Sequence, residues 1–238
     1  MRTKVEERFT EFFEKWISQL SEFLQLLMEV SSEDNKEQQE VQLQLQDLVS
    51  KVTQHYKEYY TIKWALARED VLAFFSPIWV TPLENAYSWI TGWKPSAVFK
   101  LVDSMRTSRV PGPSLTELTQ EQVGQIQELR VKIRLEEEKV EREMERQQVA
   151  IADRKMIELL RLVVRVKNGE QVSLQVEGRV QVALKGVMGG LEKVMKAADC
   201  VRLRTLKGLL DLLNPFQCVE FLAGICMLQI QISQSGKK

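Results

Sequence analysis

Apolar side chains recur every three or four residues along most of this chain, which is the spacing of one face of an α-helix. The N-terminal stripe is the clearest, and it consists of Val5, Phe9, Phe12, Trp16, Leu20, Phe23, Leu27 and Val30. A second stripe from Val41 to Phe75 predicts one extended helix that stops at Ser76-Pro77. The fold class predicted from this pattern is all-α, as a single multi-helix bundle.

A short helix is predicted after the second stripe. Thr81 can cap its start, Pro82 suits the first helical position, and Glu84 can complete a capping box. Gly92 fits the position just past the helix end, and Pro95 prevents its continuation. These residues predict a helix that begins after Thr81 and ends before Gly92.

Three tryptophans, Trp79, Trp89 and Trp93, flank the short helix, and a second short helix is expected from Ser96 to about Met105. Indole rings bury large aromatic area, so we interpret the tryptophans first as structural anchors of this corner. The alternative is a pocket for an apolar ligand such as a fatty acyl chain.

The second half of the chain begins after a loop at residues 107–113, which contains Pro111, Gly112 and Pro113. Ser114 and Glu117 form a capping-box pattern that predicts a long helix reaching Val163. The middle of this helix, residues 135–148, is mostly charged and is expected to be a solvated face.

The region after the predicted turn at Asn168-Gly169 is ambiguous. Alternating apolar residues from Val172 to Leu184 favour strands when taken alone. We prefer a helix, because an isolated hairpin would have no partner strands elsewhere. Two further helices are predicted at the end of the chain, at residues 201–213 and 216–232. Asn214 caps the second of them, which is apolar nearly all round and expected to be buried.

Composition limits the chemistry. The 238 residues include 33 Lys and Arg, 33 Asp and Glu, one histidine (His55) and three cysteines, so the formal net charge is zero. The cysteines, Cys200, Cys218 and Cys226, have neither the number nor the spacing of a zinc site or disulfide framework. His55 lies mid-helix between apolar residues. We therefore expect no catalytic residue, no metal, no cofactor and no membrane-spanning segment.

One segment combines basic and apolar side chains. Residues 193–213 alternate apolar positions with five basic residues: Lys193, Lys196, Arg202, Arg204 and Lys207. Basic amphipathic helices of this kind suit calmodulin or anionic surfaces. The alternative interpretation is a core helix with ordinary basic decoration.

Residues 74–79 (FFSPIW), 82–86 (PLENA) and 89–96 (WITGWKPS) resemble the signature of the plant Delay-of-Germination (DOG) domain. Further similarity lies at residues 115–137 and 198–217. The resemblance covers residues 7–232, with residues 233–238 as a flexible tail. It extends to the stand-alone Delay-of-Germination-like proteins and to the C-terminal region of TGA-class bZIP transcription factors.

The resemblance implies an all-helical, non-enzymatic regulator of seed maturation, dormancy and abscisic acid signalling, located in nucleus and cytoplasm. Implied partners are proteins: type 2C phosphatases, calmodulin and transcription co-regulators. The phosphatase-binding motif of the family is matched at Trp16, and Phe13 replaces its tyrosine. Its serine and leucine are not kept, because Phe12 and Glu14 stand there, so phosphatase binding is not carried over to this chain. The alternative is a DNA-associated transcription regulator, as in the TGA factors, but the bZIP segment is missing. Oligomeric state and the interaction face are left open.

Haem binding within the family is tied to a histidine pair near the C-terminal end. This chain has only His55, far from that region. We therefore expect no haem, and a haem- or lipid-sensing module is kept as a further alternative.

Overall fold

The computed structural model describes residues 2–30, 38–107, 115–153, 157–158, 161 and 174–236. Within these ranges the regular structure is helical and no strand occurs, so the prediction of an all-α fold is confirmed. The helices are α1 (Lys4–Val30), α2 (Gln38–Ala67), α3 (Leu72–Phe75), α4 (Pro82–Ala86), α5 (Pro95–Thr107), the 3-10 turn η1 (Leu115–Glu117), α6 (Gln120–Ala150), α8 (Leu174–Leu212) and α9 (Pro215–Ser235).

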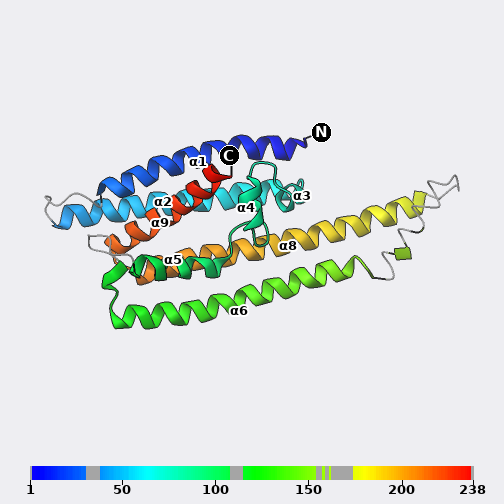
Figure 1. The fold of residues 1–238 in the computed structure, drawn as a ribbon. Helices are drawn as coiled ribbons and strands as arrows, with labels where there is room; N and C mark the ends of the chain where they lie inside the picture. The colour runs from blue at the N-terminus through cyan, green and yellow to red at the C-terminus, as the bar shows by residue number, and fades with distance from the viewer. Residues whose placement is uncertain are drawn as a thin grey trace.

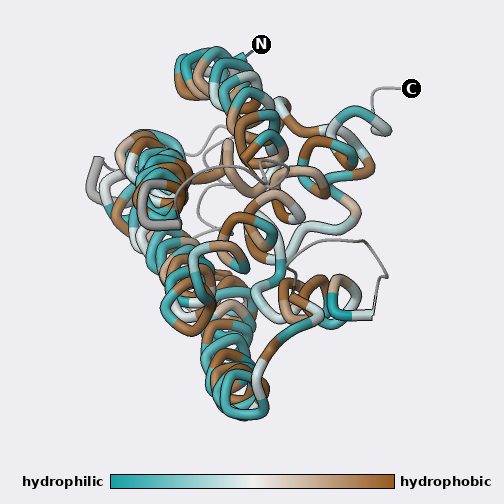
Figure 2. The backbone as a smooth tube through the Cα atoms, turned by 90° about the vertical axis from the view of Figure 1, so that its left-hand side faces the viewer, coloured by the Kyte–Doolittle hydropathy of each residue, from teal (hydrophilic) through white to brown (hydrophobic). Residues whose placement is uncertain are grey.

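The long helices lie side by side in two antiparallel pairs (Figure 1). The first pair is α1 with α2, and the second is α6 with α8. Helix α9 packs on both α1 and α2, while α5 contacts α6, α8 and α9. Teal and brown alternate along the helices in Figure 2, as expected where each helix turns one apolar face toward its neighbours.

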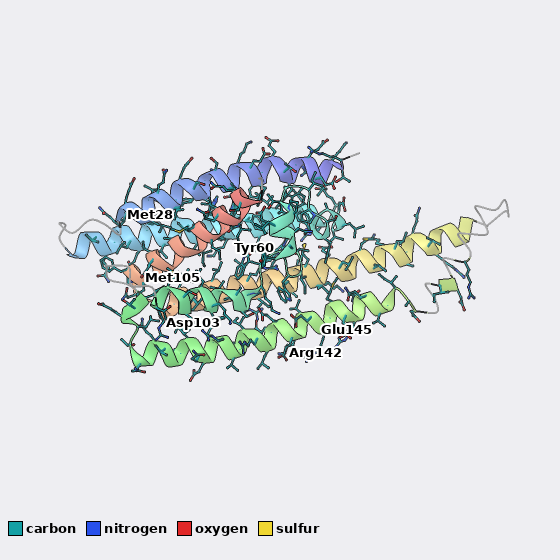
Figure 3. The ribbon with its side chains drawn as sticks, viewed as in Figure 1. Met28, Tyr60, Asp103, Met105, Arg142 and Glu145 are labelled. Carbon is teal, nitrogen blue, oxygen red and sulfur yellow. The ribbon has the colours of Figure 1, made fainter. Side chains whose placement is uncertain are left out.

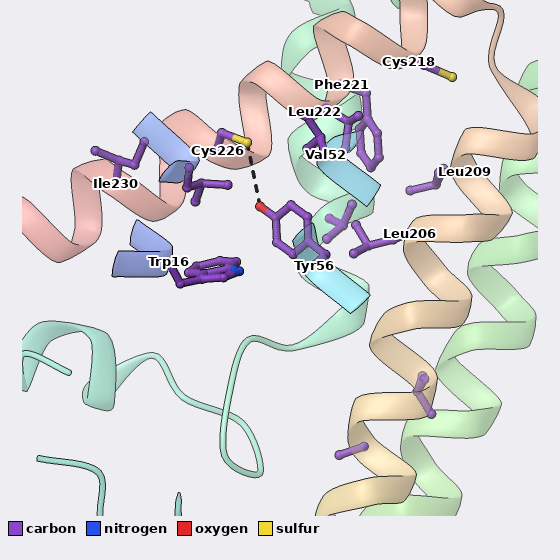
Figure 4. Close-up of a cluster of buried hydrophobic side chains, with 14 of the residues drawn as sticks. Trp16, Val52, Tyr56, Leu206, Leu209, Cys218, Phe221, Leu222, Cys226 and Ile230 are labelled. Atoms are coloured by element: carbon purple, nitrogen blue, oxygen red, sulfur yellow. Dashed lines mark hydrogen bonds between the residues drawn. The ribbon is translucent and has the colours of Figure 1, made fainter. Parts of the chain in front are cut away.

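The core forms where α1, α2, α8 and α9 meet. Trp16, Tyr56, Phe221 and Cys226 are almost fully buried there, and the Tyr56 hydroxyl lies 3.9 Å from the Cys226 sulfur (Figure 4). Burial raises the pKa of the Cys226 thiol to about 12, so the sulfur is an uncharged core group near neutral pH. This core fixes the helices that build the site described below.

The far part of the α6–α8 pair extends beyond the rest of the bundle (Figure 1). We call residues 141–150 of α6 and 178–192 of α8 the arm. Arg142 and Glu145 are exposed on α6 of the arm (Figure 3). Large apolar side chains are also exposed, with Val149 at 65% and Val182 at 72% of full exposure. The arm therefore offers both charged and apolar surface to solvent.

Two predicted helices have different bounds in the structure. The stripe from Val41 to Phe75 is broken by a turn between α2 and α3, where Glu69 and Asp70 donate backbone hydrogen bonds to the Leu66 carbonyl. The long helix α6 begins at Gln120 and not at the capping box of Ser114 and Glu117. Thr119 caps it, in a capping box with Gln122.

The ambiguous region is helical as preferred, because α8 runs unbroken from Leu174 to Leu212. Asn214 caps α9 as predicted, with its side chain accepting from the Gln217 backbone N–H at 2.9 Å. The expectation that this helix is buried all round was wrong, since Met227 and Leu228 are 43% and 49% exposed. The helix also continues to Ser235, into the segment expected to be a tail.

By length and composition, α9 is the one helix in the described ranges that could cross a membrane, although half of its most apolar stretch is buried. This differs from the expectation that no apolar stretch is long enough. Its contacts with α1, α2, α4 and α5 are those of a core helix. Of the predicted loop at residues 107–113, Thr107 is the last residue of α5, and residues 108–113 lie outside the described residues, as does the turn at Asn168-Gly169.

Candidate functional site

The predicted cap at Thr81 is confirmed. The Thr81 side chain accepts from the Glu84 backbone N–H at 3.2 Å, and the Glu84 carboxylate accepts from the Thr81 N–H at 2.7 Å. Pro82 occupies the first helical position. The helix ends earlier than expected, however, at Ala86, and Gly92 lies in the following segment. We call residues 87–94, between α4 and α5, the corner loop.

The corner loop contains a tight turn with unusual backbone angles. Ile90 and Thr91 have positive φ values of 39° and 61°, which residues with side chains rarely adopt. The Trp89 backbone N–H donates to the Gly92 carbonyl at 2.6 Å across this turn. Each such residue costs about 1–3 kcal/mol and persists only where the surroundings fix it.

Three buried charged residues lie beneath the corner loop. Asp199 of α8 accepts from Lys63 of α2 at 2.8 Å and from Arg202, one turn further along α8, at 2.6 Å. Its second oxygen accepts from the Trp64 indole N–H at 2.9 Å. All three charged side chains are at most 1% exposed. We call Lys63, Asp199 and Arg202 the charged cage.

The two cations of the charged cage bind the backbone of the corner loop. Arg202 donates to the carbonyl groups of Trp89, Ile90 (2.8 Å) and Trp93 (2.7 Å). Lys63 donates to the carbonyl of Thr91 at 3.1 Å and to its hydroxyl at 2.9 Å. The turn with positive φ is therefore held by hydrogen bonds from two helices.

Gly92 lies directly against the charged cage. A Cβ atom at this position would come within 3.1 Å of the Arg202 guanidinium carbon. The guanidinium is already fixed by Asp199 and the loop carbonyls, so it has little freedom to move away. Close approach, and not a helix end, explains the glycine here.

Burial lowers the pKa of Lys63 to about 8, and nearby Arg202 acts in the same direction while Asp199 opposes both. The charged cage holds two cations and one carboxylate, so it carries one excess positive charge when Lys63 is protonated. Because both cations already bind the loop and Asp199, this chemistry suits holding the backbone better than proton transfer.

A cavity of about 220 Å³ lies beside the charged cage. Aromatic side chains form a large part of its wall, and α9 contributes an aliphatic side, so we call it the aromatic cavity. Its lining includes Trp16, Tyr60, Trp79, Trp93, Ile225 and Leu228. Lys63, Asp199 and Arg202 also line it. An apolar cavity with a few polar groups at one side is typical of small-molecule sites.

The three tryptophans have different roles at this corner. Trp79 packs on Phe9 with ring centroids 4.6 Å apart, and Trp93 lines the cavity. Trp89 donates its indole N–H to Glu141 of α6 at 2.8 Å, which ties the corner loop to the base of the arm. Both interpretations of the tryptophans, as anchors and as cavity walls, therefore have a structural basis.

Haem does not fit the residues present. The only histidine, His55, is buried and stacks on Trp16 at a centroid distance of 4.9 Å. Its Nε2 lies 3.0 Å from the Trp16 carbonyl, and burial lowers the pKa of the ring. His55 does not line the cavity. Among the described residues, no three of His, Cys, Asp or Glu gather as a metal site. That the protein uses no cofactor stays a prediction.

Several residues expected to contact a partner are not available on the surface. Phe13, Trp16 and Arg202 are 6%, 2% and 0% exposed. Phe13 and Trp16 pack in the core, and Arg202 belongs to the charged cage. Their assignment to a partner-binding face is therefore corrected: in this fold they have structural roles.

The other predicted basic residues lie on outer positions of α8. Lys193, Arg204 and Lys207 are exposed, while Lys196 is half-buried and paired with Glu192 at 2.5 Å. Arg204 pairs with Glu136, and Lys207 pairs with Asp211 at 2.6 Å. The apolar face of the same helix is buried: Val194, Val201, Leu206 and Leu209. A partner of the calmodulin type, which needs that apolar face, would have to displace α8 from the core.

Lys63 and Asp199 were missed by sequence reasoning as functional residues. Lys63 sits in a run of aromatic residues at helical spacing, where a single lysine looks like a surface residue. Asp199 was noted only as part of a similar segment. Their spacing of 136 residues hides the pair. The one local signal was the i,i+3 spacing of Asp199 and Arg202 on a helix.

Comparison with known proteins shows to which family the chain belongs. Residues 10–104 match a family model described as DOG1, seed dormancy control. The chain is 52% identical to Protein DOG1-like 4 of Arabidopsis thaliana, over all of this chain and 96% of that protein. The chain belongs to the DOG1-like family. The resemblance stated from the signature residues is therefore confirmed, and a family involved in seed dormancy supplies the context for this protein.

More distant relatives extend the comparison. Protein RESPONSE TO ABA AND SALT 1 of Arabidopsis thaliana is 28% identical over 97% of this chain and 95% of its own length. Transcription factor TGA5 of the same plant is 29% identical over 76% of this chain but only 51% of its own length. The DOG1-like chain is thus similar to part of a transcription factor.

Proposed function

We propose that this DOG1-like protein is a non-enzymatic regulator in seed maturation and dormancy, and that it acts in nucleus and cytoplasm by binding other proteins. The observation that carries the proposal is the arm, which leaves the bundle and exposes Val149 and Val182 at 65% and 72%. Apolar side chains that are exposed on a projecting element are accessible to a partner, and this supports a role in binding proteins.

The chemistry of the interior supports the non-enzymatic part of the proposal. The buried charged groups of the cage form hydrogen bonds with one another and with the backbone of the corner loop, and so hold this loop in place. The similarity to a protein named for its response to abscisic acid and salt, and to TGA factors, supports hormone-linked control of transcription. Direct DNA reading is not proposed, since the net charge is zero and no basic zipper is found.

The test is affinity capture from extracts of maturing seed with the full chain and two variants. The arm variant carries Val149→Glu and Val182→Glu. The matched control carries Leu43→Glu on α2, where Leu43 is 68% exposed and far from the arm in sequence. We expect specific proteins to be captured by the wild type and the control and lost by the arm variant. Capture that is equal for all three chains would contradict the proposal, as would turnover of a substrate by the purified protein.

A second candidate function rests on the aromatic cavity. Its volume of about 220 Å³ and its aromatic and aliphatic lining favour an apolar ligand such as a fatty acid. Native mass spectrometry with decanoate tests it, using Ile225→Trp to fill the cavity and Met227→Trp, on the exposed side of α9, as control. We expect one decanoate per chain, lost only in Ile225→Trp. Equal masses with and without decanoate would reject this candidate.

A further inference from the structure

A second hollow lies between α5 and α6, and Ala97 is the residue that it shares with the aromatic cavity. It has a volume of about 260 Å³ and is lined by one turn of each helix. We call it the basic cleft, and its residues are Ser96, Ala97, Phe99 and Lys100 of α5 with Arg130 and Arg134 of α6. Three of the six carry a positive charge, which no element of the proposed function uses.

Arg130 is held in place but is left with an unused donor. Its Nη2 donates to both carboxylate oxygens of Asp103, at 2.9 and 2.8 Å, and to the Phe99 carbonyl at 3.3 Å. Asp103 is labelled on α5 in Figure 3. The Nε of Arg130 is buried and makes no hydrogen bond, and in the described ranges no other buried side-chain nitrogen or oxygen lacks a partner. A buried N–H without an acceptor is unfavourable, so this atom marks a position where an acceptor is missing.

The charges around the basic cleft do not balance. Lys100 and Arg134 are exposed and form no ion pair with the described part of the chain. Two carboxylates contact the lining residues, and both are already engaged. Asp103 is bound by Arg130, and Glu137 accepts from the Ser96 backbone N–H at 2.6 Å. Three cations against two carboxylates leave one excess positive charge.

We propose that the basic cleft binds a phosphate monoester, as a dianion. Its oxygens would accept hydrogen bonds from Arg134 and Lys100, which are exposed, and from the buried Arg130 Nε once that side chain turns toward the cleft, with the Ser96 hydroxyl at the edge. A dianion with several acceptor oxygens uses such converging donors better than a single carboxylate does. The cleft volume exceeds one phosphate group, so the exposed Ala97 can contact the organic part of the ester. This inference is independent of the arm and of the aromatic cavity.

The test is a titration of the full chain, at constant ionic strength, with inorganic phosphate and with a short phosphoserine peptide. The unphosphorylated peptide is the ligand control. The cleft variant carries Lys100→Gln and Arg134→Gln, two exposed residues that form no ion pair within the described ranges. The matched variant is Lys132→Gln, which removes a charge from α6 between the two cleft arginines but does not line the cleft. Calorimetry gives the affinity, and the NMR signal of the Arg130 Nε–H reports on the unused donor.

We expect saturable binding of the phosphoserine peptide, a shift of the Arg130 Nε–H signal, and no binding of the unphosphorylated peptide. The cleft variant should bind about tenfold to a hundredfold more weakly, while Lys132→Gln stays near the wild type. Stronger binding of the peptide than of inorganic phosphate would assign the site to esters on side chains, and the reverse order to small phosphates. Absence of saturable binding up to about 10 mM, or equal weakening by Lys132→Gln, overturns the proposal.

Discussion

The charged cage and the arm both contain opposite charges one turn apart on a helix, yet these charges have different consequences. Asp199 and Arg202 are at most 1% exposed and hold a strained loop. Glu143 and Arg146 of the arm form a pair of similar length, 2.8 Å, with the arginine 74% exposed. Water can replace every bond of the second pair and none of the first. Burial, and not the ion pair itself, decides how much a charge matters to the fold.

The largest expected effect is at the carboxylate of the cage. Asp199→Ala leaves Lys63 and Arg202 buried without their anion, so the free energy of unfolding should fall by about 3–5 kcal/mol. Urea unfolding followed by circular dichroism measures it. Asp211→Ala, which removes an exposed carboxylate from the same helix, is the control. An equal loss of unfolding free energy in Asp199→Ala and Asp211→Ala would contradict the conclusion that burial decides how much a charge matters.

The charged cage and the arm also differ in the space that surrounds their glycines. Gly92→Ala places a Cβ 3.1 Å from the Arg202 guanidinium carbon, so the charged cage or the corner loop must shift. We expect a loss of about 1–3 kcal/mol in the free energy of unfolding, the usual cost of overpacking. Thermal unfolding should show a lower midpoint. An unchanged midpoint would mean that the guanidinium is not fixed by its hydrogen bonds.

On the arm, a glycine-to-alanine substitution should raise the free energy of unfolding instead of lowering it. Gly186 lies inside α8, and no atom lies within 4 Å of the place where its Cβ would be. Gly186→Ala should raise the free energy of unfolding by about 0.5–1 kcal/mol, because alanine loses less backbone entropy in a helix. Urea unfolding checks this value. A destabilised variant would indicate that the arm is packed against something in solution.

The smallest effect is expected at the exposed pair of the arm. Arg146→Ala removes the pair with Glu143 and should change the free energy of unfolding by no more than about 0.5 kcal/mol. Raising the salt concentration should leave the difference between wild type and variant near zero. A loss above about 1 kcal/mol would contradict the comparison, since exposed pairs rarely contribute that much.

Much of the fold follows from local patterns in the sequence. The caps at Thr81 and Asn214 are set by side-chain to backbone bonds over three residues, and both are found as predicted. The break between α2 and α3 is not visible in the apolar stripe, because buried apolar residues stand on both sides of it, Leu66 before it and Phe74 after it. The start of α6 was misplaced because two capping patterns follow each other, at residues 114–117 and 119–122. The helix begins at the second, where the Gln122 side chain also donates to the Leu212 carbonyl and to the Gln217 side chain.

The site was less predictable than the fold. The tryptophans and Gly92 were identified, but the reason for Gly92 was wrong, since its neighbour is Arg202 from 110 positions further along. Arg202 was placed on a partner-binding face because a helical arginine in a basic segment looks exposed. Its burial depends on Asp199 and on three loop carbonyls that only the tertiary fold brings to it. Long-range electrostatics of this kind leave no local pattern in a sequence.

One helix joins the two regions compared above. Residues 178–192 of α8 belong to the arm, and Asp199 and Arg202 lie further along the same unbroken helix. At 1.5 Å per residue, about 30 Å of rigid rod separates Gly178 from Asp199. A partner that tilts the arm therefore also tilts the part of α8 that contains Asp199 and Arg202. The tilt would be transmitted to the carbonyls of the corner loop and to the wall of the aromatic cavity.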